Sequence, residues 1–279
     1  MSVVQAVVLG IVQGITEFAP ISSSGHLILV PWLLGWPKLA DPGLNKAFDV
    51  ALHVGTLAGA LVYFRDDVAR YLVAWLRSIR RRRIDGGDER LAWALVVGTV
   101  PGAAVGALFE GVIERRLGAP WLIAVMLAGF GLLLLAVDRW SRADRGLQDL
   151  TVGRGLVLGL AQAAALQPGI SRSGVTITAA RAMGIDRASA ARFSFLLSLP
   201  IIAGAGFYKG LDLVASGLGP YGAVFLWGSA ASAVSGFLTI RFLLAYLRRG
   251  GFGWFVAYRL ALAGLVLALI AAGARSATG

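Results

Sequence analysis

Apolar runs long enough to cross a lipid bilayer recur along this chain, and they limit its folds more than any other feature. Six runs lie at about 48–64, 91–109, 120–137, 192–209, 220–240 and 254–273. A helix needs about 20 apolar residues to span the hydrocarbon core, with about 17 as the lower limit. Hydrophobic residues make up 57% of the chain and charged residues 15%, so no soluble domain fits between the runs. The sequence predicts an all-α polytopic membrane protein, a single membrane domain over residues 1–279, with a charged loop at about 65–90.

The positive charges predict which helix ends face the cytoplasm. A net charge of +11 could indicate a nucleic-acid partner. In a membrane protein, arginines on cytoplasmic loops explain such a charge, so we predict no nucleic-acid partner. If the arginine-rich loop at 65–90 faces the cytoplasm, seventeen Lys and Arg residues lie on the cytoplasmic side of the membrane. Five fall outside, namely Lys38, Lys46, Arg115, Arg116 and Arg275. The opposite orientation would invert this ratio.

Two further apolar regions are broken in the middle. Residues 3–34 are interrupted by the run from Pro20 to Gly25, and residues 155–185 by the run from Pro168 to Gly174. Each flanking half has about 12 residues, or roughly 18 Å of helix, which reaches only half-way through a membrane. Backbone broken by Gly and Pro at that depth is tolerated only where it lines a cavity or is buried in protein. We therefore predict two re-entrant helical hairpins.

The two hairpins are copies of one another in sequence. Residues 8–25 align with residues 157–174 without a gap and share eight identities in eighteen positions, where chance would give about two. Each half of the chain, 1–150 and 151–279, then contains one re-entrant hairpin and three transmembrane helices. Because three crossings reverse the direction of the chain, the second copy must be inverted. This inverted-topology repeat, with broken helices near the membrane midplane, is typical of secondary transporters.

Ionisable and hydroxyl side chains gather at the first hairpin tip. Glu17 precedes Ser22, Ser23 and His26. A charge inside a membrane is costly, so an intramembrane carboxylate is a functional hypothesis by default. We predict Glu17 as a base or metal ligand, and a serine, His26 or an oriented water as the attacking group. His53 lies in a span without such neighbours in sequence, and we interpret it as a packing residue or a weak accessory.

At the second tip, Arg172 occupies the position of Ser23. Its planar guanidinium suits bidentate binding of a phosphate, so Arg172 joins the predicted catalytic residues. Glycines allow close approach of the backbone, and the amides of helix N-termini favour anions. The predicted substrate-binding residues at the two tips are Ser24, Gly25, Gly169, Ser171, Ser173 and Gly174. The alternative is that the Gly and Ser runs only break helices and that Arg172 pairs with Glu17 structurally.

Few metal sites are compatible with this composition. The chain has no cysteine and only two histidines, so thiolate sites and zinc sites built from several histidines are excluded. A divalent cation such as Mg²⁺ can still be held by Glu17 together with diphosphate oxygens, since Mg²⁺ commonly uses one carboxylate plus phosphates.

Both tips carry motifs of a known family. The segment from Gln13 to His26 resembles the first signature of the bacterial undecaprenyl-diphosphatase (bacitracin-resistance) family, a (Glu/Gln)-x-x-x-Glu box followed by Ser-Ser-x-Gly-His. The segment from Pro168 to Gly174 resembles its second signature, P-G-x-S-R-S-G. The resemblance covers nearly the whole chain. It implies functional roles for Gln13, Glu17, Ser22, Ser23, His26, Ser171, Arg172 and Ser173. Gln13 replaces a glutamate found in some members, so it cannot act as a carboxylate base, and Glu17 becomes more important.

The resemblance also implies an activity. Members would hydrolyse undecaprenyl diphosphate to undecaprenyl phosphate and orthophosphate, which recycles the lipid carrier of cell-wall synthesis and confers resistance to bacitracin. It further implies a bacterial plasma-membrane protein whose site opens to the outer face, dependence on a divalent cation (Mg²⁺ or Ca²⁺), and a homodimer.

The main alternative is an inverted-repeat lipid flippase or anion transporter without hydrolysis, in which Arg172 only binds the anion. A carrier needs neither a base nor a nucleophile beside the anion site, so Glu17 and His26 favour the hydrolase. A structural scaffold would leave the intramembrane Glu17 and Arg172 without a purpose.

Overall fold

The computed structural model describes residues 1–37, 39, 42–216 and 219–278; the side chains of 42, 110–116, 209, 211–216 and 219 are outside the description. Of the predicted outside charges, Lys38 therefore lies outside the described residues, and the side chains of Arg115 and Arg116 lie outside the description.

Helices account for the architecture, and no β-strand occurs within the described ranges. The helices are α1 (Val3–Phe18), α2 (Ser23–Leu34), α3 (Pro42–Tyr63), α4 (Arg65–Arg81), α5 (Gly87–Arg116), α6 (Pro120–Trp140), α7 (Val152–Ala164), α8 (Arg172–Ala182), α9 (Arg187–Ser216), α10 (Gly222–Tyr246) and α11 (Gly253–Ala271). Two short 3-10 turns, η1 (Leu147–Asp149) and η2 (Gly219–Tyr221), complete the described elements.

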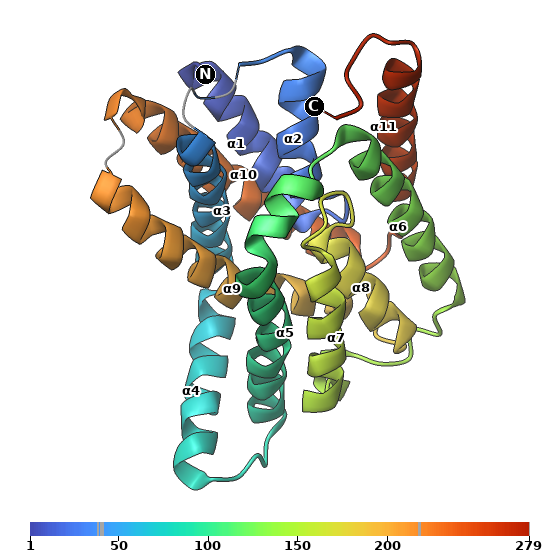
Figure 1. The fold of residues 1–279 in the computed structure, drawn as a ribbon. Helices are drawn as coiled ribbons and strands as arrows, with labels where there is room; N and C mark the ends of the chain where they lie inside the picture. The colour runs from blue at the N-terminus through green and yellow to red at the C-terminus, as the bar shows by residue number, and fades with distance from the viewer. Residues whose placement is uncertain (38, 40–41, 217–218, 279) are drawn as a thin grey trace.

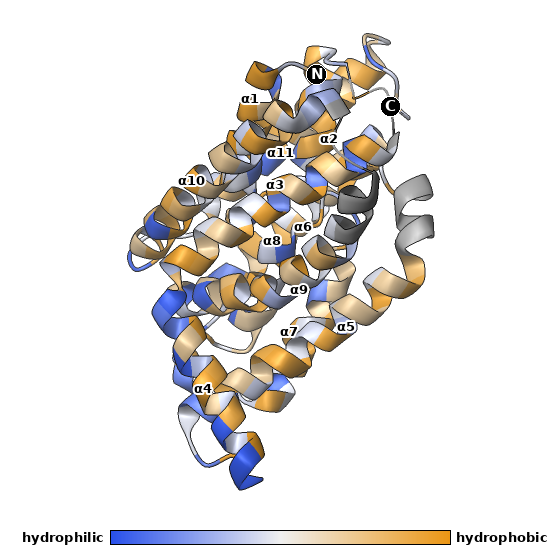
Figure 2. Ribbon diagram, turned by 90° about the vertical axis from the view of Figure 1, so that its left-hand side faces the viewer, coloured by the Kyte–Doolittle hydropathy of each residue, from blue (hydrophilic) through white to orange (hydrophobic). Residues whose placement is uncertain are grey.

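The predicted spans correspond to α3, α5, α6, α9, α10 and α11. Five of these helices, all except α3, are long and apolar enough on their own to cross a membrane. Helix α3 passes this test only together with α4, from which it is bent by 83°. Hydrophobic residues recur along these helices (Figure 2), and many large ones are exposed, among them Leu133, Trp227 and Leu238. The prediction of an all-α polytopic membrane protein is confirmed.

The two broken regions form hairpins that enter the molecule from opposite ends. In Figure 1, α1 descends from the upper end and α2 returns there, whereas α7 rises from the lower end and α8 returns downward. Both termini lie at the upper end. Helix α1 ends at Phe18 because Ala19 precedes Pro20, and a residue before proline is pushed out of the helical region. The hairpins are therefore inverted copies, as the sequence repeat predicted.

Small residues allow each hairpin to pack closely on a full-length helix. Helix α1 lies along α10, and α7 lies along α5. A Cβ atom on Gly10 would lie 2.2 Å from the carbonyl oxygen of Gly228, and one on Gly159 would lie 2.2 Å from that of Gly98. Gly10 and Gly159 are equivalent in the repeat, so both copies use the close backbone contact that small residues permit in membranes.

The prediction of a charged loop at about 65–90 was wrong for its first part, which forms helix α4. The arginine content hid an amphipathic pattern: Tyr71, Ala74 and Ser78 lie buried on one side. Acidic residues in the first turn and Arg80 and Arg81 in the last turn also suit the helix dipole. Residues 82–86 still form a connection to α5.

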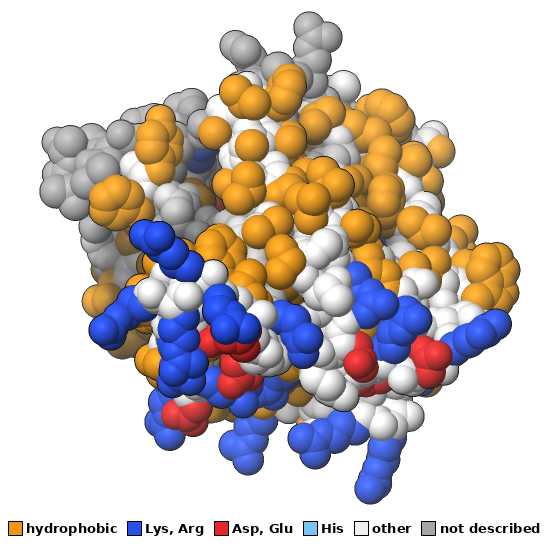
Figure 3. All heavy atoms as spheres, turned by 90° about the horizontal axis from the view of Figure 1, so that it is seen from below, with side chains coloured by type: hydrophobic (Ala, Val, Ile, Leu, Met, Phe, Trp, Pro, Cys, Tyr) orange, Lys and Arg blue, Asp and Glu red, His pale blue; other side chains and the backbone are white. Residues whose placement is uncertain are grey.

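Positive charge gathers at the end of the molecule opposite the termini. The view from below shows a broad field of Lys and Arg side chains with acidic groups among them (Figure 3). The α4–α5 and α6–α7 connections lie at this end in Figure 1. The arginine-rich loops that were assigned to one side of the membrane thus lie on one face of the fold.

Candidate active site

The two hairpin tips meet in the middle of the molecule and bond directly to each other. The amide of Gly169 donates to Ser22 Oγ at 3.0 Å, and Ser173 Oγ donates to the carbonyl oxygen of Ala19 at 3.0 Å. A Cβ atom on Gly25 would lie 3.5 Å from the amide nitrogen of Gly169. These contacts bring residues about 150 positions apart into one site, near the middle of the helical layer.

The second helix of each hairpin starts in the same unusual way. Ser22 caps α2 with φ 75° and ψ 95°, and Ser171 caps α8 with φ 76° and ψ 113°. Each side chain accepts a hydrogen bond from the amide three residues later, that of Gly25 or Gly174. Non-glycine residues at positive φ are strained and cluster at functional sites. Their recurrence at equivalent positions shows that both copies of the repeat build the tip in the same way.

Glu17 is the centre of the site. Its carboxylate is buried, with 4% of the residue exposed. Arg172 Nη2 donates to Oε1 at 2.5 Å, while Ser23 Oγ at 2.5 Å and Gln13 Nε2 at 3.0 Å donate to Oε2. The ion pair between Arg172 and Glu17 joins the two repeats. The sequence analysis left open whether these two side chains pair. Charge-assisted bonds of this kind fix both side chains.

Two buried polar atoms in this cluster are unsatisfied within the described part of the chain. They are Nη1 of Arg172 and Oε1 of Gln13. A buried donor or acceptor without a partner costs about 1–3 kcal/mol, and more if it is charged. Such atoms are expected where a ligand completes the site. Ser23 and Ser24 are partly exposed beside them, at the start of α2.

His26 lies at the same tip and bonds to Ser22 and to α11. Its Nδ1 is 2.7 Å from the carbonyl oxygen of Ser22, which can only accept, so Nδ1 carries a proton. Its Nε2 is 2.7 Å from the hydroxyl of Tyr258, and the two rings stack with centroids 5.6 Å apart. Both ring nitrogens are thus engaged inside the protein. Tyr258, on α11, was not among the predicted residues.

His53 is placed differently from the sequence interpretation. It does have site neighbours, because Nε2 lies 3.5 Å from Glu17 Oε2 across the contact between α1 and α3. Its side chain is 30% exposed. The signal in sequence was weak: only the rotation of α3 about its axis turns His53 toward α1.

Arg259 is a site residue that the sequence interpretation missed. It is fully buried on α11 and donates to the carbonyl oxygens of Pro20 in the first tip and of Gly169 and Ile170 in the second. It also donates to the carbonyl oxygens of Leu127 and Met126 in α6. Arg259 therefore holds both tips with one guanidinium. An arginine inside an apolar span is itself a functional signal, so the rule applied to Arg172 could have found it.

A second buried ionic cluster fixes the far end of α8. Asp138 at the end of α6 accepts from Arg181 Nε at 2.8 Å and from Arg187 Nε at 2.9 Å. Arg181 is buried, and its Nη1 donates to the carbonyl oxygen of Ile185. The cluster is self-satisfied, so its role is to hold α8, whose first residue is Arg172.

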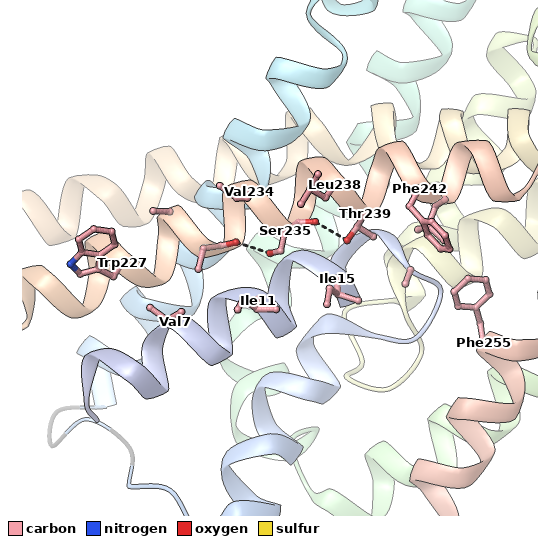
Figure 4. A pocket seen from close by; sticks show the side chains of 14 residues that line it. Val7, Ile11, Ile15, Trp227, Val234, Ser235, Leu238, Thr239, Phe242 and Phe255 are labelled. Carbon is pink, nitrogen blue, oxygen red and sulfur yellow. Dashed lines mark hydrogen bonds between the residues drawn. The ribbon is translucent and has the colours of Figure 1, made fainter.

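An apolar groove of about 820 Å³ lies on the other face of α1 (Figure 4). Its walls are Val7, Ile11 and Ile15 of α1 and residues of α10 that include Val234 and Leu238. Neither Glu17 nor Arg172 is among the residues that line it. The groove is a lipid-facing surface and not the ionic site.

The residues at the tips fit a divalent cation only with help from a substrate. Among the described residues, no three His, Cys, Asp or Glu side chains converge closely enough to hold a metal ion. The amide of Gln13 lies beside the buried Glu17 carboxylate on α1, with Nε2 toward the carboxylate and Oε1 unpartnered among the described residues. Turning the amide over would place two oxygen donors side by side. Mg²⁺ is typically bound by one or two carboxylates plus substrate phosphates, so this pair meets that minimum.

Known proteins resemble this chain over nearly its whole length. The family model described as "Bacitracin resistance protein BacA" matches residues 6–265. The undecaprenyl-diphosphatase of Moorella thermoacetica is 47% identical over 269 residues, covering 96% of this chain and 98% of that protein. That of Teredinibacter turnerae is 47% identical over 264 residues, covering 94% and 97%. That of Thermomicrobium roseum is 46% identical over 284 residues, covering 99% and 100%. The family match runs from the first hairpin into the sixth predicted span, and the chain belongs to the BacA family of bacitracin resistance proteins.

Proposed function

We propose that this chain is a membrane-embedded undecaprenyl-diphosphatase, which releases orthophosphate from undecaprenyl diphosphate and so regenerates the monophosphate lipid carrier and confers bacitracin resistance. The observation that carries the proposal is the pair formed by Glu17 and Arg172, in which a buried carboxylate and a guanidinium with a free N–H group meet between two helix N-termini. The names of its relatives supply the substrate.

Binding of the diphosphate follows from the charges at the tips. Arg172 Nη1 is free to donate to a phosphate oxygen. The N-terminal amides of α2 and α8 add partial positive charge. Phosphoryl transfer requires mainly positioning and neutralisation of the developing charge, and these groups provide both. The polyprenyl tail stays in the lipid.

The attacking group that the geometry favours is Ser23. Its Oγ donates to Glu17 Oε2 at 2.5 Å, so the carboxylate is positioned to accept the proton as Oγ attacks the terminal phosphorus. The Oγ–P bond forms, the bond from phosphorus to the bridging oxygen breaks, and polyprenyl phosphate leaves. Water then attacks the phosphoserine, orthophosphate departs, and Glu17 returns its proton to Ser23 Oγ. Ser22, which accepts bonds from Gly25 and Gly169, would hold the tip in shape.

A divalent cation, Mg²⁺ or Ca²⁺, belongs to the proposal as a cofactor. Glu17 and Gln13 would hold it together with diphosphate oxygens. When bound, it would neutralise negative charge on the diphosphate. Orthophosphate release should stop with chelator and return when the cation is restored.

The decisive measurement is orthophosphate release from undecaprenyl diphosphate by the purified protein in detergent, with Glu17→Gln, Ser23→Ala and Arg172→Lys beside the wild type. We expect release by the wild type and a loss of about 10²–10⁴-fold in Glu17→Gln. Arg172→Lys should also lose most activity, because a lysine cannot reproduce the bidentate contact. Bound diphosphate lipid without release under any cation would sink the hydrolase and favour the flippase.

The proposal also places the protein in the bacterial plasma membrane as a homodimer, with the site open to the outer side. Because the chain has no cysteine, single cysteines can report its orientation. In intact cells, a membrane-impermeant maleimide should label Arg275→Cys and leave Arg82→Cys unlabelled. The reverse pattern would refute the orientation. Cross-linking of the same variants in membranes would test the homodimer.

A further inference from the structure

We infer that His53, Glu17 and Gln13 form a site for one first-row transition-metal ion of the Mn²⁺ type, a site in which His53 Nε2 is a direct ligand. The inference deepens the proposed hydrolase function and rests on it. It differs from the expectation of Mg²⁺ or Ca²⁺ held only by oxygen atoms.

The first argument is the tautomer of His53. Nδ1 lies 2.7 Å from the backbone carbonyl oxygen of Asp49, and because a carbonyl oxygen only accepts, Nδ1 carries the proton. The lone pair of the neutral ring is therefore on Nε2, which faces Glu17 Oε2 at 3.5 Å. An imidazole nitrogen and a carboxylate oxygen that face each other in this way share either a proton or a metal cation, and the geometry suits both. A metal-bound histidine almost always donates its other N–H to a carbonyl or carboxylate, as His53 does.

The second argument is the spacing of the donor atoms. Ligand atoms about 2.1 Å from a metal ion lie about 3.0–3.4 Å from each other in octahedral or tetrahedral geometry. The separation of 3.5 Å between His53 Nε2 and Glu17 Oε2 is close to this range. The two side chains therefore need only a small adjustment to share one ion.

The third argument is the amide of Gln13. Its Nε2 lies 3.0 Å from Glu17 Oε2, while its buried Oε1 lacks a partner among the described residues. Rotating the amide by half a turn exchanges the two atoms and brings the oxygen beside the carboxylate. The site then offers one carboxylate, one amide oxygen and one imidazole from α1 and α3. The partial exposure of His53 leaves an open side for phosphate oxygens.

The donor set selects the class of metal. Mg²⁺ and Ca²⁺ prefer oxygen ligands only, whereas imidazole nitrogen suits first-row transition metals. A set rich in oxygen with one nitrogen matches Mn²⁺. Replacing His53 by an oxygen donor such as glutamine should shift the preference toward Mg²⁺.

The test uses Mn²⁺ as probe and electron paramagnetic resonance as readout. The chain has only two histidines, so any imidazole coupling comes from His26 or His53. Electron spin-echo modulation of the purified protein with Mn²⁺ should show coupling to an imidazole nitrogen. We expect the coupling to persist in His26→Gln and to vanish in His53→Gln, with Mn²⁺ bound ~10-fold or more weakly in the latter.

Absence of nitrogen coupling in the wild type, or its persistence in His53→Gln, overturns the inference. Thermal unfolding of each variant in detergent establishes that a lost signal does not come from a lost fold. Orthophosphate release measured in parallel with Mg²⁺ separates the two proposals. Release without nitrogen coupling leaves the hydrolase standing and rejects the metal site, whereas no release with any cation rejects the hydrolase itself.

Discussion

The hairpin of α1 and α2 and the hairpin of α7 and α8 reach the same point from opposite ends of the molecule, with the same serine cap at the same positive φ. They bring different side chains. Where the first copy has Glu17, Ser23 and His26, the second has Leu166, Arg172 and Val175. One copy thus supplies the carboxylate and hydroxyl, and the other supplies the guanidinium. The comparison teaches that the repeat provides the backbone of the anion site, while differences between the copies provide its chemistry.

Removing the carboxylate from the first copy should have the largest effect on turnover, because it removes the main chemical difference between the two tips. Glu17→Leu gives the first tip the residue of the second, and we expect turnover to fall by about 10²–10⁴-fold, because the proton acceptor is lost. The matched control is Leu166→Met, which keeps the volume at the equivalent position and should turn over like the wild type. Initial rates of orthophosphate release measure both. Similar losses in the two variants would show that the copies are not chemically distinct.

Arg259 tests whether the tips depend on each other. Arg259→Met leaves carbonyl oxygens of both tips without their donor, so we expect the free energy of unfolding to fall by about 3–5 kcal/mol, with a loss of activity. Thermal unfolding in detergent measures the stability of Arg259→Met against that of the wild type. Arg241→Met, at an exposed position on α10, should change stability by less than about 0.5 kcal/mol. An equally stable Arg259→Met would mean that the tips hold together without it.

The helix contacts behind the tips should respond alike in both copies. Gly10→Ala and Gly159→Ala each place a methyl group against a backbone carbonyl, and we expect each to cost about 1–3 kcal/mol. Gly204→Ala on α9, where nothing lies within 4 Å of the added carbon, serves as control and should be tolerated. A large difference between the first two variants, measured by unfolding, would argue against equivalent packing of the repeats.

Removing a serine cap should lower stability less than the other substitutions do, and the loss should be larger for Ser22 than for Ser171. Loss of a serine cap typically costs about 1 kcal/mol. Ser22→Ala should cost more than Ser171→Ala, because it leaves the buried amide of Gly169 in the other hairpin without its acceptor, whereas the further partner of Ser171 Oγ is a hydroxyl, that of Ser173, which can turn to another acceptor. Unfolding midpoints of the two variants under identical detergent conditions measure this difference. Equal midpoints would mean that the bond between the hairpins adds nothing to stability.

Features with a local signal in the sequence were predictable. Gly and Pro break the helices at the tips, the apolar runs have the length of a bilayer, and the repeat shows as identical residues at a fixed offset. Inversion of the copies followed from the odd number of spans. The placement of Glu17 beside Arg172 followed from the expectation that both tips reach the midplane, although the sequence left the purpose of the pair open.

What the sequence did not predict depends on how helices rotate and pack. His53 reaches Glu17 only through the register of α3 against α1. Tyr258 and Arg259 reach the tips only because α11 packs along α6 beside them. The fold of α4 was missed because arginine content outweighed the spacing of its apolar residues in the interpretation. Each of these is a question of orientation, which composition does not encode.

The ion pair between Glu17 and Arg172 has a consequence for how such a molecule can be assembled. Two copies of the first hairpin, associated head to head, would present two carboxylates and no guanidinium to each other, and two copies of the second would present two guanidinium groups. Like charges at this separation repel. The single chain avoids this repulsion, because its two halves carry different residues at the tips and the acid of one meets the base of the other.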